Sequence, residues 1–294
     1  MATANVSPSA AANPKAAVSA TPPEGARQAT AGKSGGRIDI ATVGGIVLAI
    51  GALVGGLLLE KGSILDIAQY TAAIIVLGGT AGAVMVSTPM KVLKGSMRRF
   101  GSIFQEKEID PKAVILELIE YAGRARKNGL VSLEPSVGKI SDPFLRKGLG
   151  LAVDGTDLQE LRRIMELEMT IADHHAESEV KVFESAGGYA PTIGIIGAVM
   201  GLIQVMKNLA NIDEVGHGIA VAFVATVYGV AAANIVFLPA ATKIKSRIQH
   251  EAHIREMMLE GTLGIAEGLN PRLLESKLEA FLPERAVPNK PKGP

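Results

Sequence analysis

Long runs of apolar residues alternate with polar stretches along the chain. Residues 40–59 form an uncharged run, and a second uncharged run from 67 to 89 follows the short turn Glu60-Lys61-Gly62. Two more runs cover residues 187–206 and about 218–238. Since about 20 apolar residues in a helix cross a bilayer, this pattern predicts four transmembrane helices. We therefore expect an all-α, polytopic membrane protein.

The segment between the second and third runs has a different character. Residues 90–186 carry dense charges of both signs, together with residues that begin and end helices. The predicted helix starts are Asp110-Pro111, Asp142-Pro143 and Thr156-Asp157, the predicted helix end is Gly129, and Asp39 is the predicted cap of the first run. This segment is expected to be a helical, water-exposed domain inserted between two membrane hairpins.

The predicted organisation has six segments. Residues 1–36 contain too little apolar material for a core and lack the apolar centre of a signal peptide. The segments are a disordered tail (1–36), a transmembrane hairpin (37–89), the helical domain (90–186), a second hairpin (187–241), amphipathic helices (242–285) and a flexible tail (286–294).

Basic residues cluster at the ends of the apolar runs that would lie on one side of a membrane, with only Lys61 and Lys207 at the other ends. Two precede the first run, four follow the second and three follow the fourth: Lys33, Arg37, Lys91, Lys94, Arg98, Arg99, Lys243, Lys245 and Arg247. Lysine and arginine next to membrane spans are retained in the cytoplasm. Both termini and the domain at 90–186 are therefore predicted to be cytoplasmic.

The third and fourth runs carry small residues at helical spacing. These are Ala190, Gly194, Gly197 and Gly201 in the third run, and Gly218, Ala222, Ala225, Gly229 and Ala232 in the fourth. Small residues let helix backbones approach closely in lipid. The stripes are explained either by packing within one chain or by contacts between identical chains, from which we expect a ring.

Two prolines lie at the predicted cytoplasmic ends of these runs. Pro191 could occupy the first turn of a helix, where its missing N–H is harmless, and Pro239 could simply end a span. Alternatively, the pair forms a hinge between the membrane helices and the cytoplasmic domain, since proline removes a backbone hydrogen bond.

Composition removes several kinds of chemistry. The 294 residues include no cysteine, which excludes disulfides and thiolate sites, and the net charge of +1 argues against binding to nucleic acid. No Asp, Glu, Lys or Arg lies inside the four runs, although ion paths usually contain an ionisable group. The polar side chains available there include Thr42, Thr71, Thr80, Thr226 and Asn234. Either no ion crosses, or a partner supplies the carboxylate.

Two weaker signals are better explained by ordinary structure. Residues 30–34 (TAGKS) end like a phosphate-binding loop. However, the motif requires a glycine at position 27, where this chain has Arg27, and no predicted strand precedes the segment. The adjacent His174 and His175 would point about 100° apart on a helix, which suits a solvated face better than a metal site. No cofactor is expected.

Three motifs carry a resemblance to a known family. The third run reads A-P-x-x-G-I-I-G-A-V-M-G-L, the fourth T-V-Y-G-V-A-A-A-N, and the polar domain contains R-K-N-G-L-V-S-L-E. Over residues 37–285 the chain thereby resembles the A subunit of the bacterial flagellar stator, the MotA/PomA family. A TolQ/ExbB-type energiser is the alternative, although its pattern has three spans. A small secondary transporter would need an intramembrane binding residue, which these runs lack.

The resemblance implies a non-enzymatic, ion-driven motor unit in the cell inner membrane. In this family a pentameric ring of A subunits surrounds B subunits of the MotB/PomB type, which supply the ion-carrying aspartate. Pro191 and Pro239 match the coupling prolines, Thr226 the threonine beside the ion path, and Arg126 and Glu134 the charges that touch the rotor protein FliG. Sodium-driven members tend to carry threonine where this chain has Ala198. The resemblance therefore favours protons.

Overall fold

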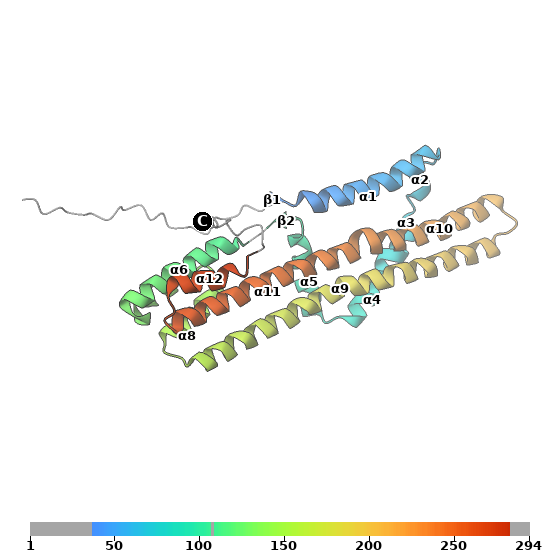
Figure 1. Ribbon diagram of the computed structural model, residues 1–294. Coiled ribbons are helices and arrows are strands. Elements are labelled where there is room, and N and C mark those ends of the chain that lie inside the picture. The colour runs from blue at the N-terminus through green and yellow to red at the C-terminus, as the bar shows by residue number, and fades with distance from the viewer. Residues whose placement is uncertain (1–36, 107–108, 283–294) are drawn as a thin grey trace, which may run out of the picture. The chain divides into compact units, whose positions relative to one another are not determined.

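The computed structural model describes residues 37–106 and 109–282 (Figure 1). The predicted tails at 1–36 and 286–294 lie outside the described residues, as does the phosphate-loop-like segment 30–34. The described chain is helical apart from one antiparallel pair of two-residue strands, β1 (Arg37–Ile38) and β2 (Gln105–Glu106). The predicted all-α class is confirmed.

The helices follow one another along the chain in this order. The first hairpin contains α1 (Ile40–Leu59), α2 (Ile64–Ile67), α3 (Tyr70–Ala73), the π-helical η1 (Ile74–Gly78) and α4 (Gly79–Ser87). Next come α5 (Met90–Ser102), α6 (Pro111–Asn128), the 3₁₀ turn η2 (Leu130–Leu133), α7 (Glu134–Val137) and α8 (Pro143–Val153). The chain continues as α9 (Leu158–Lys207), α10 (Ile212–Ala231), the π-helical η3 (Ala232–Phe237), α11 (Leu238–Ala266) and α12 (Pro271–Glu279).

Four helical segments are long and apolar enough to cross a membrane, which confirms the predicted spans. They lie at Ile40–Leu59 and Ile64–Ser87 and within Leu158–Lys207 and Ile212–Ala266. The last two far exceed a bilayer, because a helix of 50 residues is about 75 Å long and the hydrocarbon core is about 30 Å thick. The third and fourth spans therefore continue as helix into the polar segment, and residues 186 and 241 lie inside helices.

Side-chain caps begin the helices where the sequence predicts them. An N-cap carboxylate accepts a backbone N–H bond at Asp39 for α1, Asp110 for α6, Asp142 for α8 and Asp157 for α9. Gly129 ends α6 with a φ of 82°, a conformation that glycine adopts without strain. Local sequence therefore sets where these elements begin and end.

The small-residue stripes of α9 and α10 pack against each other. A Cβ built on Gly194 would lie 2.9 Å from the Ala225 carbonyl oxygen, and one on Gly201 would lie 2.7 Å from the Gly218 oxygen. Only residues without a larger side chain permit this backbone approach. Packing within one chain is thus the correct explanation of the stripes. The argument for a ring from these stripes is wrong, because they are already buried.

The second span packs on one side of the α9–α10 pair. Gly79 meets Ile193, and the buried Val76 joins a cluster with Val224 and Ala225. The helix is interrupted after α2, where the Ile67 carbonyl accepts hydrogen bonds from the Gln69 backbone N–H at 3.0 Å and from the Tyr228 hydroxyl at 2.5 Å. The second bond connects the helix break to α10 and gives the tyrosine hydroxyl a partner that lipid could not supply.

The polar helices enclose the main apolar core. Buried side chains from α6, α8, the beginning of α9, the second half of α11 and α12 form one cluster. Its fully buried members include Leu118, Leu149, Met165, Met257 and Leu274. Because α9 and α11 contribute to this core and also to the membrane spans, the two parts share two unbroken helices.

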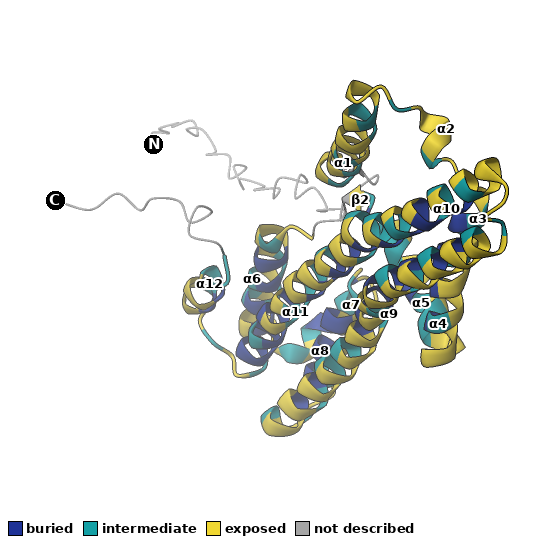
Figure 2. Cartoon of the chain, turned by 90° about the vertical axis from the view of Figure 1, so that its right-hand side faces the viewer, coloured by how far each residue is buried: buried dark blue, intermediate teal, exposed yellow. Residues whose placement is uncertain are grey.

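The first span has little contact with the rest of the described chain. None of the α1 residues is buried, and most of its surface is exposed (Figure 2). An open cleft of about 360 Å³ separates the helix from η3 and α11, with Gly45, Ala49, Asn234 and Pro239 in its lining. The helix is held mainly at its N-terminal end, where β1 pairs with β2.

The close contact between α9 and α10 can be tested with a pair of glycine variants. Gly229→Ala should destabilise the protein by about 1–3 kcal/mol, as overpacking does. The new Cβ would lie 2.5 Å from the Ala190 carbonyl oxygen and 3.1 Å from the Gly194 Cα, and neither backbone atom can rotate away. Thermal denaturation of the purified protein in detergent measures the change.

Gly188→Ala in the same helix pair is the matched control. No neighbouring group of the described chain lies within 4 Å of the Cβ position, so alanine should be neutral or stabilise the helix slightly. Equal stability of the Gly229→Ala and Gly188→Ala proteins would contradict the proposed backbone contact.

Candidate ion-path and coupling site

Ala198 and Thr226 lie at one level of the α9–α10 pair. The residues that precede them, Gly197 and Ala225, are in contact: a Cβ on Gly197 would lie 2.8 Å from the Ala225 Cβ. The contacts pair rising residue numbers in α9 with falling numbers in α10, so the helices are antiparallel. One further residue turns each helix by about 100°, and in an antiparallel pair the two turns lead to the same side.

This side is opposite the second span. Val224 and Tyr228, which meet the second span, lie on the other side of α10 from Thr226. Pro191, seven residues before Ala198, shares the side of Ala198. The structure thus brings three of the predicted site residues to one surface.

That surface is apolar and uncovered in the single chain. Leu202 on α9 and Ile219 and Val230 on α10 lie toward it with exposed side chains. A membrane surface of this kind must be covered by lipid or by another protein helix. We refer to it as the Ala198/Thr226 face.

Two of the four threonine hydroxyls predicted in the spans bond within their own helices, and the Thr42 hydroxyl accepts a hydrogen bond from a lysine of α11. Thr226 donates to the Ala222 carbonyl at 3.2 Å, and Thr80 donates to the Val76 carbonyl at 2.6 Å. Thr71 is the exception among the described residues, since its buried hydroxyl has no hydrogen-bond partner. The Thr226 oxygen keeps acceptor capacity, because its hydrogen bond uses only the proton.

Ionisable groups lie only at the ends of the spans. The helix of the fourth span begins at Ile212, earlier than predicted, and therefore includes Asp213 and Glu214 in its first turn. Asp66 similarly caps α2 at the beginning of the second span. Within the described spans, the helix interiors contain no Asp, Glu, Lys or Arg.

The two prolines predicted to couple the membrane helices to the polar domain both lie within continuous helices. Pro191 lies in the interior of α9, so its placement in a first turn is wrong. Pro239 does not end a helix either, because helix continues through it to Ala266. The two prolines lie at a similar level, since a Cβ on Gly187 would be 2.5 Å from the Leu238 side chain.

The π-helical segment η3 ends at Phe237, two residues before Pro239. Proline cannot donate to the carbonyl four residues earlier and its ring crowds that group, so a local change in helical pitch relieves the conflict. π-Helical turns of this kind occur where helices bend. The sequence predicts the proline but contains no clear signal for the π-helix.

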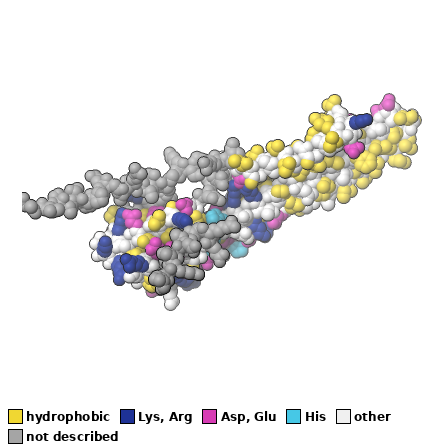
Figure 3. All heavy atoms as spheres, turned by 45° about the horizontal axis from the view of Figure 1, so that its top comes forward, with side chains coloured by type: hydrophobic (Ala, Val, Ile, Leu, Met, Phe, Trp, Pro, Cys, Tyr) yellow, Lys and Arg dark blue, Asp and Glu magenta, His cyan; other side chains and the backbone are white. Residues whose placement is uncertain are grey.

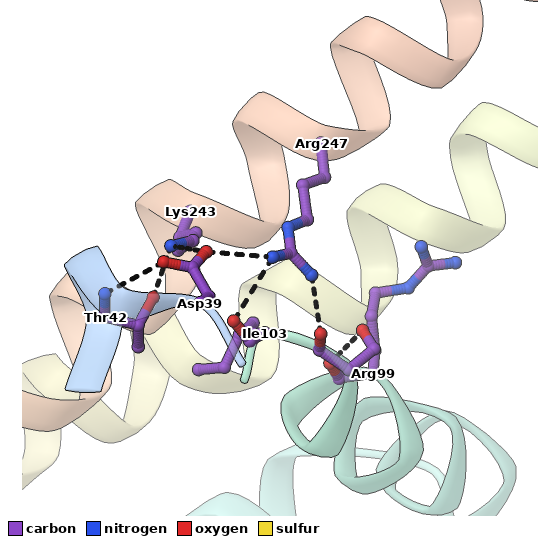
Figure 4. Close-up of polar contacts among 7 residues, drawn as sticks. Asp39, Thr42, Arg99, Ile103, Lys243 and Arg247 are labelled. Atoms are coloured by element: carbon purple, nitrogen blue, oxygen red, sulfur yellow. Dashed lines mark hydrogen bonds and ion pairs between the residues drawn. The ribbon is translucent and has the colours of Figure 1, made fainter. Parts of the chain in front are cut away.

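An ion-pair cluster joins the beginning of α1 to α11 (Figure 4). The Asp39 carboxylate accepts hydrogen bonds from the Lys243 ammonium and, at 3.2 Å, from the Arg247 guanidinium. Arg247 also donates to the carbonyl groups of Ser102 and Ile103 at 2.6 and 3.2 Å. The cluster therefore connects the first span, the end of α5 and the helix that carries Pro239.

Sequence analysis identified Asp39 only as a helix cap. The available signal was the spacing of Lys243 and Arg247, which lie four residues apart and so share one helix face. Hydrogen bonding from Lys243, followed by the Thr42 backbone N–H, lowers the pKa of Asp39 to about 2. The carboxylate therefore remains ionised at any physiological pH.

Arg126 and Glu134 lie at the far end of the polar helices. Arg126 is in the last turn of α6, Glu134 begins α7, and both are exposed. Gly129 turns the chain between them, and the buried Leu133 anchors the turn to the core. Within the described residues neither charge belongs to an ion pair, whereas the neighbouring Arg124 is paired with Glu120.

Comparisons with known proteins agree with this geometry. Residues 136–257 match the model of the MotA/TolQ/ExbB proton channel family, and residues 43–128 match the motility protein A N-terminal model. Motility protein A of Bacillus subtilis is 37% identical over 249 residues, which cover 84% of this chain and 92% of the relative.

Solved structures show the same fold. The structure of C. jejuni MotAB superposes with a TM-score of 0.80 at 33% identity and covers 86% of this chain and 98% of that one. The flagellar MotAB stator complex from Bacillus subtilis gives 0.77 at 37% identity, covering 83% and 97%.

The chain belongs to the MotA/TolQ/ExbB proton channel family, in the branch of the flagellar stator A subunits. It is a multi-pass protein of the inner membrane and a stator subunit of the bacterial flagellar motor, not an enzyme. The match to the motility-specific N-terminal model favours the stator over the TolQ/ExbB-like energiser.

The Asp39 cluster can be tested by charge removal. Asp39→Asn should destabilise the protein by about 1–3 kcal/mol, because it weakens charge-assisted hydrogen bonds and leaves Lys243 and Arg247 without their anion. Asp154→Asn, an exposed position that makes no ion pair within the described residues, is the matched control. Thermal denaturation in detergent at pH 7 compares both variants with the original chain.

The pH dependence has a defined sign. Since folding lowers the pKa of Asp39 from 3.8 to about 2, the stabilisation is present above about pH 4 and is lost as pH falls toward 2. This component of acid destabilisation should be missing from Asp39→Asn. An Asp39→Asn protein with the stability and acid profile of the original chain would show that the cluster contributes nothing.

Proposed function

We propose that this chain forms the ion path of a stator together with a B subunit, whose membrane helix lies on the Ala198/Thr226 face. The principal support is the face itself, which is apolar, exposed and located in the middle of two spans. The solved relatives are described as MotAB complexes, which fits such a partner.

The partner supplies the ion-carrying carboxylate. The described span interiors contain no ionisable group, whereas a route for cations through lipid needs one. An aspartate on a B subunit of the MotB/PomB type would lie beside the Thr226 hydroxyl, the polar side chain nearest to the middle of the face. Pro191 at one end of the same face would respond to the charge state of that aspartate.

Helix continuity links this site to the rotor. α9 and α11 carry the two prolines in the membrane region and enter the polar core without a break. Bending at Pro191 and Pro239 would therefore displace the polar domain as a body. Torque then passes to FliG through Arg126 and Glu134, whose charges have no ion-pair partner within the described chain.

The assembly is a ring of identical chains, pentameric as in the family that the chain resembles. Its support is the apolar surface of the spans left uncovered in one chain, and no longer the small-residue stripes. The basic residues that follow the second and fourth spans support an orientation with both termini and the polar domain in the cytoplasm.

The ion is the proton. A dehydrated sodium ion needs several oxygen ligands, whereas a proton can cross on a single carboxylate. The methyl group of Ala198 offers no oxygen, and Thr226 offers one. The Ala198/Thr226 face is therefore poorly equipped for sodium.

Motility of a stator-deficient strain tests the function and the ion together. Cells that rely on this chain and its B subunit should swim in sodium-free medium with the proton gradient intact and should stop on addition of a protonophore at high sodium. Failure to restore swimming with any candidate B subunit would contradict stator function. Swimming that requires sodium and survives the protonophore would overturn only the ion assignment.

Charge reversal tests the rotor contact. Arg126→Glu and Glu134→Lys should each reduce swimming speed several-fold without loss of membrane expression, because each reverses a charge at an electrostatically steered interface. A complementary reversal on FliG should restore part of the speed. Lys112→Glu, an exposed charge at the opposite end of α6, is the control and should swim normally.

Normal swimming of a chain that carries both Arg126→Glu and Glu134→Lys would contradict this role. The two residues would then be ordinary surface charges.

A further inference from the structure

Helix α5 has two distinct faces and begins directly after the second span. One face is turned to α9, where Val92 and Leu93 pack near Val182 and Ala186. Further along this face Phe100 stacks on Phe183 at a centroid distance of 5.5 Å. This contact fixes which residues the helix presents outward.

The outward face combines apolar and basic side chains. Met90 and Met97 are 53% and 61% exposed and, being seven residues apart, follow one edge of this face. Lys91 and Arg98, also seven residues apart, follow the other edge, and the exposed Lys94 lies between the two edges. We call these five residues the α5 outer face.

The three cations of this face have no acidic partner in the described chain. Ion pairs within residues 37–106 and 109–282 leave out Lys91, Lys94 and Arg98. The adjacent Arg99 behaves differently, since Glu179 on α9 binds it at 2.5 Å. The charge on the inward side is thus neutralised within the protein, whereas the outward charges remain available.

We propose that the α5 outer face binds anionic phospholipid headgroups of the membrane leaflet at which the second span ends. The helix begins three residues after Ser87, the last residue of that span, so its first turn lies at the boundary of the bilayer. Figure 3 shows Lys and Arg side chains on the visible surface where the apolar spans give way to mixed polarity.

The two kinds of side chain match the two layers of a membrane surface. Methionines at one edge enter the acyl region, and the cations at the other edge bind phosphate oxygens. A second copy of this chain would need an acidic surface here, and it would have to exclude lipid at the end of a span. Charge and position therefore favour lipid. This proposal does not depend on the motor function.

Lipid retention tests the proposal directly. The stator complex purified in mild detergent is offered phosphatidylglycerol and phosphatidylcholine, and native mass spectrometry counts the lipids retained. We expect a preference for phosphatidylglycerol that falls more than tenfold in Lys91→Gln/Lys94→Gln/Arg98→Gln, since each cation near an anionic surface contributes about fivefold.

A matched triple variant controls for total charge. Lys112→Gln/Lys139→Gln/Arg272→Gln removes three exposed cations of the polar helices and should keep the preference of the original chain. Equal loss in both triple variants, or an unchanged preference in the α5 variant, would overturn the proposal.

A spin label distinguishes lipid from a protein partner. This chain contains no cysteine, so Met97→Cys gives one attachment site on each copy of the chain in a complex made with a cysteine-free B subunit. In vesicles with phosphatidylglycerol, a label at 97 should be more accessible to oxygen than to a polar nickel reagent, as expected at a membrane. Val131→Cys, exposed in the polar domain, should show the opposite order.

Two results would contradict membrane contact. Low accessibility of the label at 97 to both reagents would mean that protein covers the α5 outer face. High accessibility to nickel would mean that water covers it.

Discussion

Backbone contact between α9 and α10 is the constraint on which the rest of the membrane region depends. Gly194, Gly201 and Gly229 bring the two helices so close that main-chain atoms of one meet main-chain atoms of the other. In lipid the association of apolar helices gains little from the hydrophobic effect, so van der Waals contact at this distance must supply much of the attraction. The contact also fixes the rotation of each helix about its axis.

Because the rotation of α9 and α10 about their axes is fixed, the helix pair has two sides with different neighbours. One side contacts the second span, and there the Tyr228 hydroxyl donates a hydrogen bond to the Ile67 carbonyl at the break in the helix. The other side holds Ala198 and Thr226 and leaves an apolar surface for a partner. A rotation of α10 by about 100° would bring Thr226 into the helix contact and move Tyr228 away from the second span, so the glycine contacts also position the proposed ion path.

Continuity of the long helices gives the same contact a mechanical consequence. The polar core and the membrane spans share α9 and α11, and flexible loops do not separate them. Proline within a helix weakens it locally without ending it. In the proposed mechanism, bending is therefore concentrated at the level of Pro191 and Pro239, while the Asp39 cluster connects the first span to the helix just beyond Pro239.

Sequence alone determined the four spans, the helix starts and the residues of the candidate site. These features depend on local physics: the length of an uncharged run, the capping capacity of an aspartate, or the left-handed conformation of Gly129. Motif spacing identified Arg126, Glu134, Pro191, Pro239, Ala198 and Thr226 through a family resemblance. It did not show which of these residues lie on a common surface.

Only the tertiary structure decided which helices meet and what remains uncovered. The small-residue stripes fit contacts within a chain or between chains equally well, because a stripe records close packing and not its partner. The Asp39 cluster joins residues more than 200 positions apart, and the Tyr228 bond depends on a helix break that has no clear sequence signal. Such interactions depend on how the helices are placed relative to one another. The periodicity of a single helix shows which face is apolar or small, but it does not predict which helix packs there.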